Sequence, residues 1–179
     1  LLFKKNKVTQ IHGRAQIVSK GDVINLSVDG ASEVIVKAKN VIIATGSQPR
    51  QMDSVPVDND YICDNKGALS IPNTPKHLLV IGAGVIGLEM GSVWRRLGAK
   101  VTILEALPTF LAVVDETVAK EAKKIFTKNV GLDIRLGCAV QKVIRKGKKI
   151  TVTYTEDNNL KTLECDRIVV AVGRVPNSN

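Results

Sequence analysis

The stretch Val80-Ile81-Gly82-Ala83-Gly84-Val85-Ile86-Gly87-Leu88-Glu89 places three glycines between an apolar strand pattern and a helix pattern. Gly82 permits a tight turn out of the strand, Gly84 lets the backbone approach a pyrophosphate, and Gly87 lets helix and sheet pack closely. The phosphates then meet exposed N–H groups at the start of the helix. The run therefore predicts a cradle for a dinucleotide.

The flanks of this run agree with that interpretation. Residues 78–81 are continuously apolar, as expected of a parallel strand buried on both faces. Four apolar residues then recur at helical spacing and predict a helix face, namely Ile86, Met90, Val93 and Leu97. Gly98 follows as a C-terminal cap. A second apolar strand, 101–104, ends at Glu105, about 20 residues past the glycines, where an acid that binds ribose is expected.

The charge of the chain does not predict a nucleic-acid partner. Lys and Arg number 26 against 17 Asp and Glu, which gives a net charge of +9 over 179 residues. The basic residues are dispersed, except in 142–149, which we interpret as a hairpin tip. Aromatic residues make up only 3 % of the chain, so no stacking platform for bases is expected.

Cys63, Cys138 and Cys165 lie too far apart in sequence for a metal knuckle or a CxxC redox pair. We interpret them as buried or spare thiols and predict no metal site. His12 and His77 belong to no recognisable nucleophile or metal constellation, so no catalytic residue is predicted. The sequence has no signal-peptide pattern and no apolar run long enough to span a membrane, so a soluble, reducing compartment is expected.

Strand and helix patterns divide the chain into two parts. From 8 to 44, β-rich runs alternate with turn signals at 19–22 and 28–30, and an apolar strand at 40–44 runs into a Gly turn. The prolines between 48 and 75 mark an interdomain connection. The first residue is Leu1 and no closing element is visible after Arg174, so we expect a piece of a longer protein.

Downstream of Glu105 the patterns predict one more helix and a β-meander. Asp115 can cap a helix that ends near Gly131. Its apolar face would hold Val118, Ala122, Ile125 and Phe126. Residues 132–136 would return to the sheet, the runs 139–145, 149–155 and 160–165 would form the meander, and 167–172 reads as a buried strand. A β-meander inserted in a βαβαβ unit fits this order.

Five segments resemble, in order and spacing, the middle of the dihydrolipoamide dehydrogenases, which are flavin disulfide reductases: LFKKNKVT, VIIATGSQP, KGALSIP, PKHLLVIGAGVIGLEMGSVWRRLGAKVTILEA and VVAVGRVPN. The resemblance implies an α/β fold, with a Rossmann-like NAD-binding domain at 76–173 that carries the inserted β-meander. It also implies a β-rich remnant of the FAD-binding domain at 1–47, a connecting segment at 48–75, and a return to the FAD-binding domain at 174–179.

The resemblance implies a path for electrons in the parent enzyme, from dihydrolipoamide through a redox disulfide and FAD to NAD. The implied partners are NAD, dihydrolipoamide carried by a lipoyl domain, and a second copy of the parent within a 2-oxo acid dehydrogenase complex. The implied location is the cytoplasm in a bacterium or the mitochondrial matrix in a eukaryote. The FAD glycine motif, the CxxxxC disulfide and the HxxxxE acid/base of the family do not occur in this sequence, so we expect the chain alone to be inactive.

Site roles follow partly from the residues and partly from the resemblance. The residues predict NAD contacts by the run from Gly82 to Glu89, including Ala83, Val85, Ile86 and Leu88, and by Glu105. Glu89 also suits the helix dipole with no ligand bound, while the resemblance brings its carboxylate to the nicotinamide end. The resemblance alone adds further NAD-side positions: Val140, Ala171, Gly173 and Arg174. It also places four backbone positions beside FAD: Ala15, Thr45, Gly46 and Ser47.

Three other functions remain open at this stage. An NADP-linked disulfide reductase is disfavoured because no Arg follows Glu105 to receive a 2′-phosphate. A soluble pyridine nucleotide transhydrogenase is compatible with the same residues. So is a non-enzymatic dinucleotide-sensing module in which the same cradle is regulatory.

Overall fold

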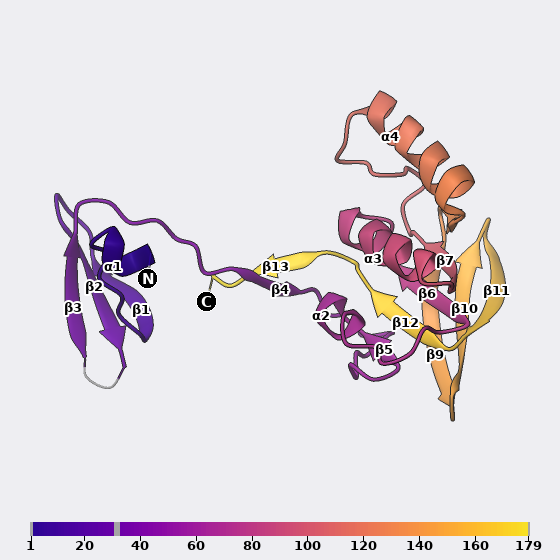
Figure 1. The fold of residues 1–179 in the computed structure, drawn as a ribbon, viewed down its shortest axis with the longest axis horizontal. Helices are drawn as coiled ribbons and strands as arrows, with labels where there is room; N and C mark the ends of the chain where they lie inside the picture. The colour runs from indigo at the N-terminus through magenta and orange to yellow at the C-terminus, as the bar shows by residue number, and fades with distance from the viewer. Residues whose placement is uncertain (1, 31–32, 179) are drawn as a thin grey trace. The chain divides into compact units, whose positions relative to one another are not determined.

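The computed structural model describes residues 2–30 and 33–178 and divides the chain into two compact units, Leu1–Thr45 and Gly46–Asn179. The first unit holds the helix α1 (Leu2–Lys5) and an antiparallel sheet of order β1-β2-β3 (Figure 1). Its strands are β1 (Arg14–Ser19), β2 (Ile24–Asp29) and β3 (Val34–Ala38). They occupy the region where the sequence predicts β-rich runs.

The apolar strand expected at 40–44 is wrong. Residues 40–46 carry no assigned strand, and the side chains of Ile42 and Ile43 are 90 % and 73 % exposed. An apolar run forms a strand only when a neighbouring strand pairs with its backbone, and no described strand pairs with this segment.

A five-stranded, fully parallel sheet of order β5-β12-β6-β7-β8 forms the centre of the second unit. Its strands are β5 (Ile62–Cys63), β6 (His77–Ile81), β7 (Lys100–Leu104), β8 (Asp133–Arg135) and β12 (Arg167–Val170). The expected connection at 48–75 is therefore more than a linker, because it supplies an edge strand of this sheet. The same stretch contains α2 (Asn65–Ala68) and all but the first residue of β4 (Ser47–Pro49), which pairs with β13 (Arg174–Pro176).

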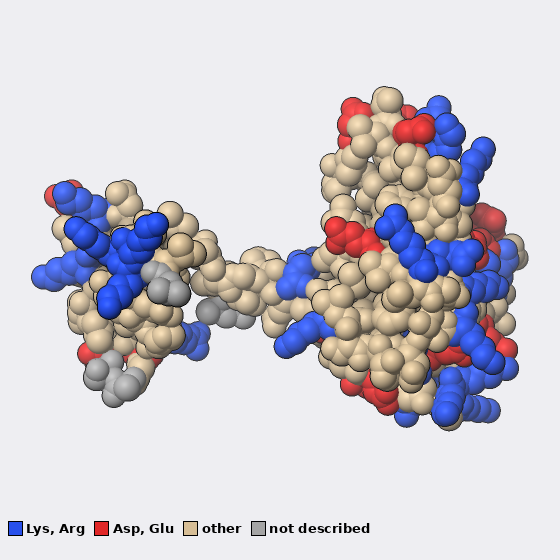
Figure 2. All heavy atoms as spheres, in the orientation of Figure 1, with Lys and Arg blue, Asp and Glu red and all other residues tan. Residues whose placement is uncertain are grey.

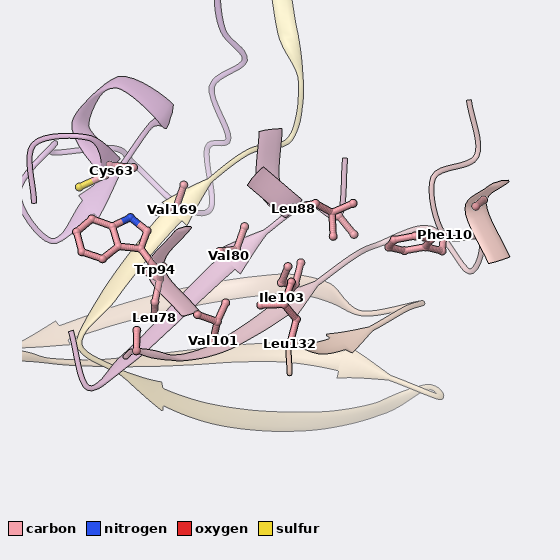
Figure 3. Packing of buried hydrophobic residues seen from close by; sticks show 14 residues of the cluster. Cys63, Leu78, Val80, Leu88, Trp94, Val101, Ile103, Phe110, Leu132 and Val169 are labelled. Atoms are coloured by element: carbon pink, nitrogen blue, oxygen red, sulfur yellow. The ribbon is translucent and has the colours of Figure 1, made fainter. Parts of the chain in front are cut away.

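The helix α3 (Val85–Arg96) packs on one face of the parallel sheet (Figure 3). Leu78 and Val80 of β6 point to this face, together with Val101 and Ile103 of β7. The buried residues of α3 are Gly87, Leu88, Gly91 and Trp94. The expected face was therefore wrong for Val93 and Leu97, which are exposed. The buried stripe is displaced because two of its four residues are glycines, which hydrophobic periodicity does not mark.

The β-meander covers the opposite face of the sheet. It consists of β9 (Ala139–Lys146), β10 (Lys149–Glu156) and β11 (Asn159–Cys165), paired in the order β11-β10-β9. Leu79 and Ile81 of β6 point towards it and pack with Ile150 and Val152. The second unit is thus a mixed α/β structure of three layers, in which successive residues of the buried strands face opposite layers.

The last helical segment changes type along its length. The helix α4 (Glu116–Lys124) begins at Asp115, whose carboxylate accepts from the N–H groups of Thr117 and Val118 at 3.0 and 3.2 Å. It continues as a π-helix, η1 (Ile125–Val130), which ends at Gly131 with φ of +80°. Both predicted ends are confirmed, although the single α-helix expected between them is not. No described helix has the length and hydropathy needed to cross a membrane.

Candidate functional site

The candidate site lies where β6, β7 and β12 end, at the first turn of α3. A cavity of about 540 Å³ opens there between the glycine turn, residues 104–113, residues 138–140 and residues 171–173. Ligands of open α/β sheets bind at this carboxyl end of the strands. Residues 106–113, which follow Glu105 after the end of β7, form one side of the cavity. We call them the wall segment.

Two glycines of the turn are required by packing. A Cβ on Gly82 would lie 2.5 Å from the carbonyl oxygen of Ala171, and one on Gly87 would lie 2.0 Å from the carbonyl oxygen of Gly82. Both distances are far shorter than any real carbon–oxygen contact. The strand, the turn and the helix can therefore approach one another only because these residues have no side chain.

Gly84 differs from the other two glycines. A Cβ at this position would have no atom within 4 Å, so packing does not require a glycine here. Gly84 is the N-cap of α3, and no side chain caps the helix. The first N–H groups of a helix have no partner within it and carry the positive end of its dipole. The open backbone at Gly84 therefore suits an anion that approaches closely.

Glu105 follows the last residue of β7, and its half-exposed carboxylate turns towards the glycine turn. One oxygen, Oε2, accepts from the Ala83 N–H at 2.7 Å, and the other, Oε1, accepts from the Leu107 N–H at 2.9 Å. Its backbone is fixed as well, because the Glu105 N–H donates to Arg135 and its carbonyl accepts from Cys138. The acid predicted from its position after β7 therefore lies beside the predicted cradle.

The structure brings some of the predicted site residues together at the cavity. Nine of them line it: Gly82, Ala83, Gly84, Val85, Ile86, Glu105, Val140, Ala171 and Gly173. Gly87 and Leu88 are buried beneath the turn, and Glu89 is exposed on α3 outside the cavity lining. Gly87, Leu88 and Glu89 could therefore help to shape the site, but only the nine lining residues face the cavity.

Arg174 lies outside the cavity lining and is held by other groups. Its Nε donates to Ser47 Oγ at 2.7 Å, and its terminal nitrogens donate to the Ser47 carbonyl and to Asn65 Oδ1. These bonds tie β13 to β4 and to the start of α2. Arg174 is therefore engaged within the chain rather than directed at the cavity.

The residues expected beside FAD belong to different units. Ala15 lies on β1 and Thr45 ends the first unit, whereas Gly46 and Ser47 begin the second. The flavin contacts remain a prediction.

Sequence reasoning missed several residues that line the cavity, among them Met52, Leu111, Val113, Cys138 and Val172. Val172 and Cys138 come just after β12 and β8, so the rule that ligands bind beyond strand ends could have found them. The wall segment and Met52 carry no comparable signal, because their position depends on tertiary packing.

The cavity is weakly charged. Among the described residues that line it there is no Lys or Arg, and Glu105 is the one carboxylate. Burial raises the pKa of the Cys138 thiol to about 11, so it stays protonated at neutral pH. On the face shown in Figure 2, Lys and Arg of the second unit lie over several elements with acidic side chains between them, as the dispersed sequence pattern predicts.

Of the cysteines and histidines expected to take no part in the site, Cys138 lines the cavity and the others do not. All three cysteines are buried and free, and the described residues contain no group of three His, Cys, Asp or Glu that could hold a metal ion. His77 lies at the start of β6, at the opposite end of the strand from the cavity, with its Nε2 2.9 Å from Thr102 Oγ1.

The model of the pyridine nucleotide-disulphide oxidoreductase family matches residues 1–179, so the chain belongs to this family. The chain is 55 % identical to a dihydrolipoyl dehydrogenase of Cupriavidus necator over 99 % of its own length and 37 % of that protein. It is 38 % identical to a mitochondrial dihydrolipoyl dehydrogenase of Schizosaccharomyces pombe over 98 % of its length and 34 % of that protein. It thus spans little more than a third of these relatives.

Solved structures agree with the family assignment. LpdA of Mycobacterium tuberculosis superposes with a TM-score of 0.83 at 26 % identity, over 98 % of this chain and 38 % of that one. A flavoprotein disulfide reductase of Escherichia coli, RclA, superposes with a TM-score of 0.76 at 25 % identity, over 99 % of this chain and 40 % of that one. The resemblance to the dihydrolipoamide dehydrogenases, inferred from the five sequence segments, is confirmed.

Proposed function

We propose that residues 76–173 form a Rossmann-like domain whose cavity binds NAD. The diphosphate would lie against the N–H groups at the start of α3, with Gly84 allowing its close approach. The Glu105 carboxylate would accept hydrogen bonds from the hydroxyls of the adenosine ribose. The observation that carries this proposal is the placement of Glu105, 2.7 Å from the backbone nitrogen of Ala83, next to a helix start that no side chain caps.

The electrostatics of the cavity favour NAD over NADP. A 2′-phosphate about 4 Å from the Glu105 carboxylate costs about 1 kcal/mol in water and about 4 kcal/mol at an effective dielectric constant near 20. These energies correspond to about fivefold to about a thousandfold discrimination. No Lys or Arg among the described cavity residues would offset the repulsion.

In the parent protein this domain would take part in the oxidation of dihydrolipoamide, the activity that the relatives' names imply. The redox chemistry between the disulfide and NAD would be supplied by FAD when it is bound in the parent. The residues of this chain would bind and orient the dinucleotide, and the apolar wall of the cavity would exclude water from it. A lipoyl domain would deliver the substrate, and the parent would act as a homodimer within a 2-oxo acid dehydrogenase complex.

The 179-residue chain should not turn over dihydrolipoamide. Neither a CxxxxC pair nor an HxxxxE pair occurs in it, so it lacks the thiols that accept electrons and the acid/base that serves them. Formation of NADH from dihydrolipoamide and NAD by this chain alone would contradict the proposal.

Calorimetric titration with NADH and with NADPH tests the binding role directly. We expect NADH to bind at least about fivefold more tightly, the lower limit set by the electrostatic argument. Glu105→Ala should weaken NADH binding, because it removes the acceptor for the ribose hydroxyls. It should also narrow the preference for NADH over NADPH, because it removes the charge that repels the 2′-phosphate. Equal affinities for the two cofactors, unchanged by the substitution, would reject the proposed role of the cavity.

A further inference from the structure

The carboxylate of Glu105 joins two separate walls of the cavity. Ala83, which donates to Oε2, belongs to the glycine turn after β6, and Leu107, which donates to Oε1, belongs to the wall segment after β7. Both donors are backbone groups. Each carboxylate oxygen is therefore engaged before any ligand is present, and the two bonds fix the separation of the turn from the wall segment.

The wall segment has few other anchors. The Leu107 carbonyl accepts from the Gly137 N–H at 3.0 Å, the side chain of Phe110 is buried in the hydrophobic cluster that also holds Leu88 and Ile103 (Figure 3), and Leu111 packs against that cluster. By contrast, Val113 is 94 % exposed, and Leu111 has φ of +48°, an unfavourable conformation for a leucine. The contact through Glu105 is therefore one of the few that hold this segment over the cavity.

We propose that Glu105 is a positioning residue that pre-forms the diphosphate cradle, in addition to the ribose contact of the proposed function on which this inference rests. Its carboxylate orients the Ala83 peptide, and with it the adjoining Gly84 and the start of α3. A phosphate group then meets N–H donors that are already in place, so binding does not have to order them.

Neutralising Glu105 should change the affinity for pyrophosphate in opposite directions, depending on whether Glu105 positions the donors or only repels the ligand. A carboxylate beside the cradle repels a diphosphate, so neutralising it should tighten the binding of inorganic pyrophosphate if charge were its main contribution. If Glu105 positions the donors, neutralising it should weaken that binding instead. Pyrophosphate has no ribose, so the ribose contact does not enter the comparison.

Glu105→Gln is the test variant and Glu89→Gln the matched control. The glutamine keeps the size of the side chain but has one acceptor oxygen, so it can satisfy only one of the two N–H groups. Glu89 lies one turn into α3, is exposed, and its side chain takes part in no hydrogen bond or ion pair within the described chain. The nicotinamide contact that the resemblance implies for Glu89 does not enter, because pyrophosphate has no nicotinamide. Substitution of Glu89 removes a nearby negative charge without touching the contact between the two walls.

Calorimetric titration of the 179-residue chain with inorganic pyrophosphate gives the first readout. We expect E105Q to bind about fivefold more weakly, as the loss of one hydrogen bond predicts, and E89Q to bind as tightly as the unsubstituted chain or more tightly. Equal or tighter binding by E105Q overturns the proposal. So does a lack of pyrophosphate binding by the unsubstituted chain, because a pre-formed cradle needs no ribose.

Amide hydrogen exchange gives a second readout that needs no ligand. In E105Q, exchange at Ala83 or Leu107 should become about tenfold faster, because one N–H group loses its acceptor. Unchanged exchange at both amides overturns the positioning role. If exchange and pyrophosphate binding change as expected while NADH fails to bind the unsubstituted chain, the proposed function fails and the positioning role stands.

Discussion

The three glycines of the turn contribute to the site in different ways. Gly82 and Gly87 allow backbone atoms of the strand, the turn and the helix to approach one another, whereas Gly84 leaves open space at the helix start. A shared sequence motif thus combines two glycines that packing requires with one, Gly84, that leaves room for a ligand. Substitutions at these glycines should separate folding from binding.

Gly87→Ala should destabilise the second unit by about 1 to 3 kcal/mol, the usual range for overpacking. The added Cβ would meet the Gly82 backbone carbonyl, which cannot rotate away. Gly84→Ala is the matched control, because its Cβ meets nothing within 4 Å and its φ of −74° suits alanine. It should unfold in urea within about 1 kcal/mol of the parent chain but bind NADH more weakly. A G87A variant as stable as G84A would show that α3 can move away from the glycine turn at little cost in free energy.

His77 should make stability depend on pH. Burial, and then the charge of Lys100, hold the pKa of its imidazole below the ordinary value of 6.5. The unfolded chain therefore binds the proton more readily than the folded chain between the lowered pKa and 6.5. The contribution to stability is complete above pH 6.5 and is lost as the pH falls towards the lowered pKa.

Urea unfolding between pH 7.5 and 5 measures this dependence. The free energy of unfolding should fall with pH in the parent chain and fall less in His77→Gln. Asp58 and Asp133 also have lowered pKa values, but from an ordinary value of 3.8, so their contributions are lost at lower pH. Parallel curves for the two chains would show that another group causes the change.

Among the elements, the buried strands were the easiest to predict. Residues 78–81 and 101–104 are apolar in sequence and lie in β6 and β7, because a strand covered on both faces has little room for polar side chains. The exception is Thr102, which is fully buried and shares its hydroxyl between His77 and Asp133. Polar bonds of this kind are not visible in a pattern of hydrophobic residues.

The face of α3 was harder to predict for a physical reason. Hydrophobic periodicity marks large apolar residues, and it marked Val93 and Leu97, which are exposed. The buried side of α3 instead holds Gly87 and Gly91 together with Leu88 and Trp94, and at Gly87 the helix comes so close that a larger residue does not fit. The glycine motif predicts close packing at Gly87, whereas Gly91 lies outside the motif and nothing in the sequence marks it as a packing position.

The meander is joined to the parallel sheet by a hydrogen bond as well as by apolar packing. The Arg135 guanidinium of β8 holds Asp133 and donates to the Tyr154 hydroxyl of β10 at 2.8 Å. Tyr154→Phe should lower the free energy of unfolding by about 1 kcal/mol through loss of this bond. Tyr61→Phe is the control, since its ring keeps its contacts with Arg145 and Arg167. Equal stability of the two variants would mean that water replaces the lost acceptor.

Across the whole molecule, the parts that local sequence specifies were predicted better than the parts that depend on distant segments. The turn, the acid after β7 and the caps at Asp115 and Gly131 each follow from a short pattern. The wall segment has no such pattern, because it is held at the cavity by contacts with distant parts of the chain: the packing of Phe110 and Leu111, the bond from Gly137 and the contact with Glu105. The part of the cavity lining that the wall segment supplies could therefore not be predicted before the fold was known.

The segment between the two units should be the first site of proteolysis. Residues 40–46 form no strand, and the exposed Ile42 and Ile43 offer the apolar side chains before which thermolysin cleaves. Cleavage requires an extended, accessible backbone, which the paired strands of the second unit do not offer. Brief digestion should therefore yield a resistant fragment beginning near residue 42, identified by its mass. The hairpin tip at 147–148 is an internal control, because it is exposed but lacks an apolar residue. Earlier cleavage within the parallel sheet would show that the second unit opens more readily than its buried core implies.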